Sequence, residues 1–257
     1  MPKPSVIFVP GSFSIPEHYD PIFEAVRFKG VNIRGIQLPS ACAKPEGAPP
    51  TMYDDAAFIA SEVQKEVDQD KDVILIPHSY GGVPTSESTK GLSKKEREAE
   101  GKKGGIIRLA YLTCLVPPVG KSAGEMLLEV PSESKLELKI DENGWMYHDR
   151  PDLTAAIAFS DLLPSEGEDF VRKFVQHSAP SFAGELTHPG YKDIPASWLF
   201  CARDKCIPAR NQQEAIGLIE RVSGRRVDVT RIEADHVPNA SQPQLVIDWI
   251  VDVVAKA

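Results

Sequence analysis

The sequence predicts a doubly wound α/β fold, in which a mostly parallel six-stranded sheet is flanked by helices. Six short segments, some continuously apolar and others alternating between apolar and polar residues, are separated by amphipathic stretches of helical spacing. The runs predicted as strands are residues 5–9, 31–38, 73–76, 106–113, 197–202 and 226–232. This alternation of strands and helices is typical of a parallel sheet covered on both faces. We expect residues 1–257 to form a single domain, because α/β folds of this length commonly share one core.

The connecting helices are predicted where apolar residues recur every three or four positions. They are expected over residues 16–28, 53–67, 210–222 and 244–255, with a further helix after the glycines that follow residues 73–76. Residues 90–103 are crowded with lysine and glutamate. Mixed charges at this density rarely form a site, so we expect a solvated helix end and a surface loop there.

The regular alternation of predicted strands and helices is interrupted between residues 119 and 193. Helices are expected near residues 123–128, 153–163 and 167–176, and a turn at residues 141–144 is flanked by short extended pieces. Ligands bind at the carboxyl edge of such sheets. We therefore expect residues 119–193 to be a cap inserted over that edge.

The composition argues against several classes of function. The net charge of -8 comes without a basic stripe and interleaved aromatics, so no nucleic-acid surface is predicted. Neither the dispersed histidines nor the four cysteines have metal-site spacing, and we expect no metal and no cofactor. Residues 1–4 lead into the first strand without a hydrophobic signal, and no apolar run approaches the length of a membrane span. We expect a cytoplasmic protein with a small-molecule substrate; a homodimer is compatible with the sequence.

The third predicted strand ends at Pro77-His78-Ser79-Tyr80-Gly81-Gly82. A serine between a strand end and a glycine-rich helix start is typical of a nucleophile elbow, a tight turn that lifts the hydroxyl clear of the sheet. Small residues after the serine let strand and helix approach closely, and Gly81 and Gly82 meet that need. Pro77 stands where the G-x-S-x-G pattern has its first glycine, so the motif alone is degenerate.

An acid and a histidine follow the last two predicted strands. Asp204 comes after the fifth strand and His236 after the sixth, in the chain order Ser, Asp, His. A serine hydroxyl becomes a nucleophile when an imidazole takes its proton, and a carboxylate orients that imidazole. The pattern predicts Ser79 as nucleophile, His236 as general base and Asp204 as orienting acid. Asp235 is the weaker candidate because neighbouring side chains diverge, and the strand that ends at Thr113 offers no carboxylate.

These motifs resemble those of the α/β-hydrolases and, within them, of the plant methylesterase and hydroxynitrile lyase group. The resemblance covers nearly the whole chain, and its most specific segments are Asp204-Lys205-Cys206-Ile207-Pro208 and Ala234-Asp235-His236. It implies the α/β-hydrolase fold, the three catalytic residues given above, and an oxyanion hole formed by the backbone N–H groups of Ser12 and Tyr80.

Two positions depart from the family's pattern. Pro10 stands where the family usually has a histidine before Gly11, so a side chain that braces the oxyanion loop is missing. Val237 stands where lyase members have a lysine after the catalytic histidine. The second departure favours acyl chemistry over cyanohydrin cleavage.

The substrate pocket is expected to include Phe13, His78, Trp145 and His148, because aromatic rings shape apolar acyl or alcohol sites. The sequence thus predicts a carboxylic ester hydrolase that cleaves a small to medium, uncharged ester, thioester or lactone through an acyl-enzyme. Two alternatives stay open. One is cleavage of a carbon–carbon bond by the same residues, as in a β-diketone, and the other is a ligand-binding protein with a vestigial triad.

Overall fold

The computed structural model describes residues 3–43, 45 and 47–257; residues 1 and 2 of the expected lead into the first strand lie outside that range. The main sheet has six strands in the order β10-β9-β5-β4-β1-β2, and every neighbouring pair is parallel. The strands are β1 (Ser5–Val9), β2 (Asn32–Gly35), β4 (Asp72–Pro77), β5 (Gly105–Leu112), β9 (Ala196–Cys201) and β10 (Asp228–Ile232). The predicted six-stranded α/β fold is confirmed.

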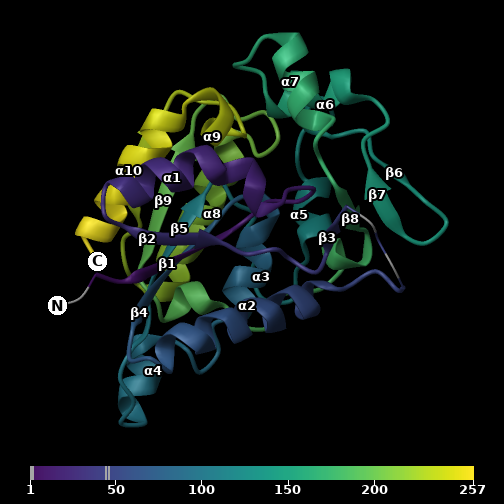
Figure 1. Ribbon diagram of the computed structural model, residues 1–257. Coiled ribbons are helices and arrows are strands. Elements are labelled where there is room, and N and C mark those ends of the chain that lie inside the picture. Colours follow the sequence, from purple (N-terminus) through teal and green to yellow (C-terminus); the bar gives the residue numbers. More distant parts are fainter. Residues whose placement is uncertain (1–2, 44, 46) are drawn as a thin grey trace.

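Helices cover both faces of this sheet (Figure 1). On one face, α1 (Asp20–Phe28) and α10 (Pro243–Ala255) pack on one set of strand side chains. On the other, α2 (Met52–Val67), α3 (Gly82–Glu87) and α8 (Ala209–Ser223) pack on the alternate set. Successive strand residues point to opposite faces. The inner strands β1, β4 and β9 are therefore buried along almost their whole length, whereas the edge strands β2 and β10 also have exposed positions.

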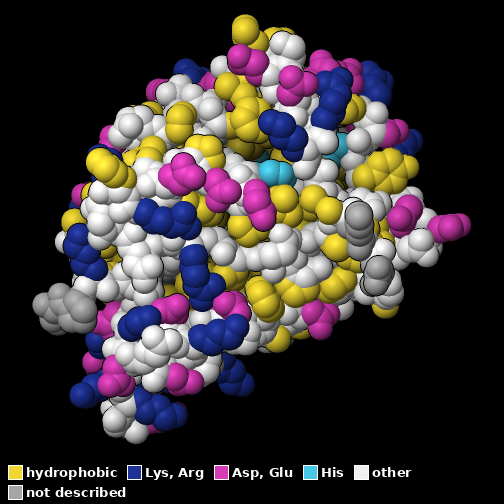
Figure 2. All heavy atoms as spheres, viewed as in Figure 1, with side chains coloured by type: hydrophobic (Ala, Val, Ile, Leu, Met, Phe, Trp, Pro, Cys, Tyr) yellow, Lys and Arg dark blue, Asp and Glu magenta, His cyan; other side chains and the backbone are white. Residues whose placement is uncertain are grey.

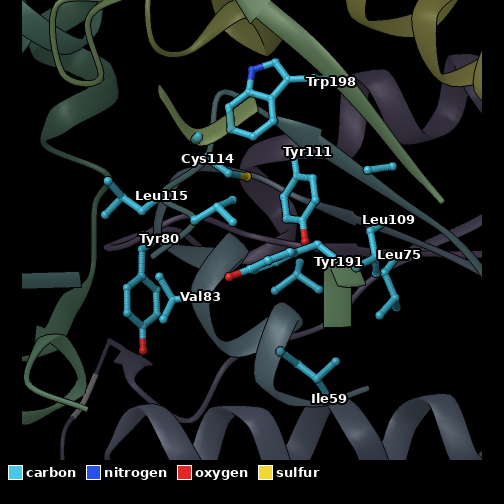
Figure 3. Packing of buried hydrophobic residues seen from close by; sticks show 14 of the residues in the cluster. Ile59, Leu75, Tyr80, Val83, Leu109, Tyr111, Cys114, Leu115, Tyr191 and Trp198 are labelled. Carbon is cyan, nitrogen blue, oxygen red and sulfur yellow. The ribbon is translucent and has the colours of Figure 1, made fainter. Parts of the chain in front are cut away.

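Aromatic side chains fill the core on the α2, α3 and α8 face. Tyr111 of β5 packs on Trp198 of β9 with ring centroids 5.5 Å apart, and Figure 3 shows both with Tyr191. The Tyr111 hydroxyl lies 3.0 Å from the Ser86 hydroxyl, so the buried phenol has a hydrogen-bond partner. These contacts join β5, β9 and α3, and therefore hold together the strands and the helix that surround the elbow.

The segment between β5 and β9 contributes three helices, of which α5 (Ala123–Leu128) has the predicted bounds. The other two, α6 (Pro151–Ala158) and α7 (Pro164–Val171), are shorter than expected. A new helix, α7, begins at Pro164 because proline is favoured in the first turn of a helix, so its start lies three residues before the predicted one. Both helices lie at the upper right of Figure 1, beyond the edge of the main sheet.

A second, antiparallel sheet was not predicted. Its four short strands, in the order β3-β8-β7-β6, are β3 (Ala41–Cys42), β8 (Gln176–Ser178), β7 (Trp145–Tyr147) and β6 (Lys139–Ile140). β6 and β7 are the short extended pieces expected on either side of the turn at residues 141–144. The helix expected over residues 167–176 was wrong at its end, because α7 ends at Val171 and Gln176 begins β8. Strands of two or three residues are too short to show an alternating pattern.

The remaining elements are short. They are α4 (Lys94–Ala99), α9 (Pro238–Ser241) and the 3-10 turns η1 (Pro16–Tyr19), η2 (Ser79–Gly81), η3 (Ser132–Ser134), η4 (Pro180–Phe182) and η5 (Gly190–Lys192). The lysine-rich region around α4 is not wholly solvated as expected, because Arg97 is buried and donates to the carbonyl groups of Val67 and Gly104. None of the helices in the described ranges is both long and apolar enough to cross a membrane.

Candidate active site

Ser79 lies in a sharp turn between β4 and α3. Its backbone has a φ of 52°, in the left-handed region where a residue with a side chain is strained. A Cβ on Gly81 would lie 2.7 Å from the Pro10 carbonyl oxygen, and one on Gly82 would lie 2.5 Å from the Leu115 carbonyl oxygen. Both positions therefore require glycine. Pro77 ends β4 paired with Val9, where its ring is accommodated.

The structure brings Ser79, His236 and Asp204 together from three strand ends. His236 Nε2 lies 2.9 Å from Ser79 Oγ, and His236 Nδ1 lies 2.7 Å from Asp204 Oδ2. An ionised carboxylate can only accept, so the hydrogen of the neutral imidazole is on Nδ1 and Nε2 can accept the serine proton. All three residues are less than a tenth exposed.

Asp204 receives four hydrogen bonds. Its Oδ1 accepts from the amides of Cys206 and Ile207 at 2.7 and 2.8 Å, and its Oδ2 accepts from His236 and from the Thr113 hydroxyl. The end of β5 offers no carboxylate, but it supplies the Thr113 hydroxyl, a role that the sequence did not indicate. The Thr113 φ of 37° is unusual for a β-branched residue and sets the side chain at this strand end.

Asp235 does not face the imidazole of the adjacent His236. Its carboxylate accepts from the Asp161 amide at 3.0 Å and from the Ser241 hydroxyl at 2.7 Å. Burial is the main cause that raises the pKa of Asp235. Asp161 in turn accepts from Arg203 and from the Asp235 amide, both at 2.9 Å. These bonds join the turn between α6 and α7 to the loop that carries His236.

The loop after β1 approaches the elbow closely. A Cβ on Gly11 would lie 3.1 Å from Ser79 Cβ. The Gly11 amide donates to the Tyr19 hydroxyl at 3.3 Å, and the Phe13 amide donates to His177 Nδ1 at 3.4 Å. Within the described residues, the amides of Ser12 and Tyr80, the two expected oxyanion donors, have no hydrogen-bond partner.

His78 joins the loop after β1 to the loop that carries His236. Its Nε2 lies 2.9 Å from the His236 carbonyl oxygen, which can only accept, so Nε2 carries the hydrogen and Nδ1 accepts from Tyr19 at 2.8 Å. Burial lowers the pKa of His78 to about 3 and raises that of Tyr19 to about 12, so both stay neutral. The Tyr19 hydroxyl contacts the loop where the family's histidine is replaced by Pro10.

Tyr80 is anchored through its side chain. Its hydroxyl donates to Asp55 Oδ2 at 2.7 Å, and in Figure 3 it points toward α2, which carries Asp55. The ring stacks on Phe182 at 5.0 Å and meets His177 edge to face at 4.8 Å. Burial raises the pKa of Asp55 to about 6, and the Ser40 amide at 2.9 Å stabilises its carboxylate.

A cavity of about 250 Å³ opens at Ser79 and His236. Its walls are mainly apolar, and they include Leu115, Leu127, Leu128, Val130, Leu136, Leu138, Phe174, Phe182, Ile207 and Val237. On the face shown in Figure 2, histidine side chains reach the surface between hydrophobic ones. No aspartate or glutamate lines the cavity in the described part of the chain.

Three of the four predicted pocket residues line this cavity: Phe13, His78 and His148. His148 Nδ1 lies 2.8 Å from the Thr154 hydroxyl, its ring meets Phe13 edge to face at 4.3 Å, and burial lowers its pKa to about 4. Trp145 does not line the cavity and is buried in the small sheet. A sequence does not tell which face of a short hairpin meets a cavity, because successive side chains alternate.

Asp204, Cys206 and His236 place potential metal-binding atoms within 4.8 Å of one another. The carboxylate oxygens and both imidazole nitrogens already make hydrogen bonds to protein groups. Burial raises the pKa of the Cys206 thiol well above its usual value, which disfavours the thiolate that a metal requires. These residues therefore fit a proton-transfer site better than a metal site.

The profile of the alpha/beta hydrolase family matches residues 6–249, and the chain belongs to that family. Among similar proteins, "Probable hydrolase R7" of Phoma sp. (strain ATCC 20986 / MF5453) is 29% identical, over 98% of this chain and 99% of the relative. The solved structure of tomato methylketone synthase I with 2-tridecanone has a TM-score of 0.74 at 17% identity, covering 100% and 99% of the two chains. That of polyneuridine aldehyde esterase has a TM-score of 0.72 at 18% identity, covering 98% and 99%. These plant α/β-hydrolases of the methylesterase-like group share the fold, in agreement with the resemblance in the sequence.

Proposed function

We propose that the protein is a serine hydrolase that cleaves a small to medium, uncharged ester, thioester or lactone through an acyl-enzyme. The observation that carries this proposal is the line of hydrogen bonds from Ser79 Oγ to His236 Nε2 and from His236 Nδ1 to Asp204. The hydroxyl, the imidazole and the carboxylate stand at the distances that nucleophilic catalysis requires. The family membership and the "hydrolase" in the name of the Phoma relative agree with it.

The proposed reaction has two halves. Ser79 Oγ attacks the ester carbonyl carbon while its proton passes to His236 Nε2, and the carbonyl oxygen becomes an oxyanion held by the amides of Ser12 and Tyr80. The C–O bond to the alcohol then breaks, and His236 gives the proton to the leaving alkoxide. In the second half His236 takes a proton from water, the hydroxide attacks the acyl group, and the acid leaves as Ser79 regains the proton.

The cavity walls support the proposed substrate class. Hydrocarbon side chains make up most of the lining, which favours apolar acyl or alcohol groups. A volume of about 250 Å³ accommodates a small or medium molecule. The neutral imidazoles of His78 and His148 add no charge to these walls, and within the described residues Lys135 is the one lysine or arginine in the lining.

We further propose that residues 119–193 act as the cap of a single domain, and that the protein is cytoplasmic and can form a homodimer. Val130, Leu136 and Leu138 of this segment line the cavity. Replacing the segment by a short linker should abolish selectivity among substrates.

The cellular location and the oligomeric state need separate tests. Cell fractionation would test whether the protein is cytoplasmic, and light scattering would test whether it forms a homodimer.

A panel of aryl and methyl esters, thioesters, lactones and a β-diketone tests the reaction class, with Ser79→Ala as the matched control. We expect turnover of at least one acyl ester, thioester or lactone by the wild type and a loss in kcat on the order of 10⁶-fold in Ser79→Ala. Activity on the β-diketone alone would favour carbon–carbon cleavage. Tight ligand binding without any turnover would favour a binding protein.

A further inference from the structure

We propose that His177, a residue outside the predicted triad, is a positioning residue that fixes the oxyanion loop through the Phe13 amide. The proposal rests on the function proposed above. It concerns the backbone N–H and C=O groups of Gly11 and Phe13, the residues on either side of Ser12. His177 lies in β8, within the cap segment, so the cap would set the geometry of the oxyanion hole.

Each of these four backbone groups has a hydrogen-bond partner. The Gly11 amide donates to Tyr19 at 3.3 Å, and the Gly11 carbonyl accepts from the Ser14 amide at 3.4 Å. The Phe13 amide donates to His177 Nδ1 at 3.4 Å, and the Phe13 carbonyl accepts from the Val175 amide at 3.0 Å. Among the described residues, the Ser12 amide is the one N–H of Gly11, Ser12 and Phe13 without an acceptor. The pattern leaves that single donor available to an oxyanion.

The tautomer of His177 follows from its other neighbour. The Ser181 hydroxyl donates to the Ser178 carbonyl at 2.8 Å, so its oxygen can only accept from His177 Nε2, 3.0 Å away. Nε2 therefore carries the hydrogen, and Nδ1 presents a lone pair to the Phe13 amide. Burial lowers the pKa of His177 to about 3, which keeps the imidazole neutral and Nδ1 able to accept.

The backbone at Phe13 requires such support. Its φ of 61° is in the left-handed region, where a bulky residue is strained and persists only when its surroundings hold it in place. The rings of His148 and Phe174 pack on the Phe13 ring at 4.3 and 6.3 Å. The hydrogen bonds of the Phe13 carbonyl and amide, at 3.0 and 3.4 Å, add to this support. Hydrogen bonds in an active site are often long in the free enzyme and shorten in the transition-state complex.

Two substitutions separate the two nitrogens of His177. The amide oxygen of asparagine can occupy the place of Nδ1, so His177→Asn keeps the acceptor for Phe13. The longer glutamine reaches the place of Nε2, so His177→Gln keeps the bond to Ser181 and loses the acceptor. We expect kcat of His177→Gln to fall about 10- to 100-fold with KM changed less than about 3-fold, since removal of a whole oxyanion donor costs about 10² to 10³. His177→Asn should retain most of the activity.

Ligand affinity and amide exchange distinguish positioning from a merely structural role. The fall in kcat should be matched by the loss of affinity for an aryl trifluoromethyl ketone, which forms an oxyanion with Ser79, while affinity for the parent methyl ketone stays unchanged. Hydrogen exchange of the Phe13 amide should accelerate in His177→Gln and not in His177→Asn. Ser181→Ala leaves His177 in place and removes the acceptor of its Nε2–H. The imidazole hydrogen is then no longer fixed on Nε2, and kcat should fall about 3- to 10-fold.

Equal activity of the glutamine and asparagine variants, or a change confined to KM, would overturn the proposal. Should both His177 variants fail to fold, an unchanged kcat in Ser181→Ala would overturn it. A wild type that hydrolyses none of the esters, thioesters and lactones would refute the proposed function. Exchange of the Phe13 amide would then still decide whether His177 holds the loop.

Discussion

At the scale of single residues, Asp204 depends on a hydroxyl at the end of β5. Thr113 donates to the same carboxylate oxygen that accepts from His236. Thr113→Val keeps the shape and removes the donor, and a hydrogen bond to a charged group contributes about 1.5–3 kcal/mol. We expect kcat/KM to fall about 10-fold or more as the carboxylate loses its orientation. Steady-state kinetics would measure this, and Thr113→Ser should stay close to the wild type. Equal losses in both variants would show that the hydroxyl is not the cause.

The Tyr19 hydroxyl supports the oxyanion loop, where Pro10 has no side chain that could do so. This hydroxyl accepts from the Gly11 amide and donates to His78, so Tyr19→Phe removes two hydrogen bonds and keeps the ring. We expect kcat to fall about 10-fold with little change in KM, because the oxyanion loop is displaced and the substrate walls are not. An effect on KM alone would indicate that the hydroxyl shapes the pocket instead.

At the scale of elements, the packing of α3 against the strand ends decides whether the elbow can form. A Cβ at Gly82 would lie 2.5 Å from the Leu115 carbonyl oxygen and 2.7 Å from Cys114 Cβ. Gly82→Ala should therefore destabilise the fold by about 1–3 kcal/mol or more and reduce activity. Gly217 of α8 meets only the flexible end of Arg221, and Gly217→Ala should instead stabilise by about 0.5–1 kcal/mol. Urea unfolding of both variants would check the opposite signs, and equal destabilisation would contradict them.

The elements also show how far the sequence could predict the structure. The strand at residues 5–9 and the helix at residues 123–128 have their predicted bounds. In the first a continuous apolar run, and in the second a helical spacing, agrees with the flanking turn residues. The pairing of β3 with β8 joins Ala41 to His177, far apart in the chain, and no local pattern announces it. The same separation along the chain explains why the roles of His177 and Thr113 were not predicted. The roles of His177 and Thr113 depend on which loops meet in the fold. Ser79, Asp204 and His236 instead follow strands that the sequence predicts, and the assignment of these three as a triad stays a prediction.

At the scale of the whole molecule, buried histidines make stability depend on pH. Burial lowers the pKa of His78 and His177 to about 3 and that of His148 to about 4, against an ordinary value near 6.5. Between these values the unfolded chain binds protons that the folded chain does not, so stability falls as the pH decreases below about 6.5. Asp55, whose pKa is raised to about 6, acts in the opposite direction between about 6 and 3.8, and Asp235, whose pKa burial also raises, acts in the same sense as Asp55. The three histidines outnumber these two carboxyl groups.

We expect the free energy of unfolding to decrease from pH 7 to pH 5, with each histidine contributing up to about 1.4 kcal/mol per pH unit. Urea unfolding at several pH values measures the slope. His148→Gln removes one of these groups and should make the slope shallower by close to one proton. A slope that is unchanged in this variant, or stability that rises on acidification, would contradict the account.

The central claim is that Ser79 is a nucleophile activated by His236 and oriented with Asp204. Its most direct measurement is intact-protein and peptide mass spectrometry after reaction with a fluorophosphonate. We predict one phosphonyl group per chain, attached to Ser79, with labelling abolished in Ser79→Ala and slowed by a factor on the order of 10³ or more in His236→Ala. Unlabelled Ser79 in a preparation that still turns over esters, or labelling at the same rate without His236, would contradict it.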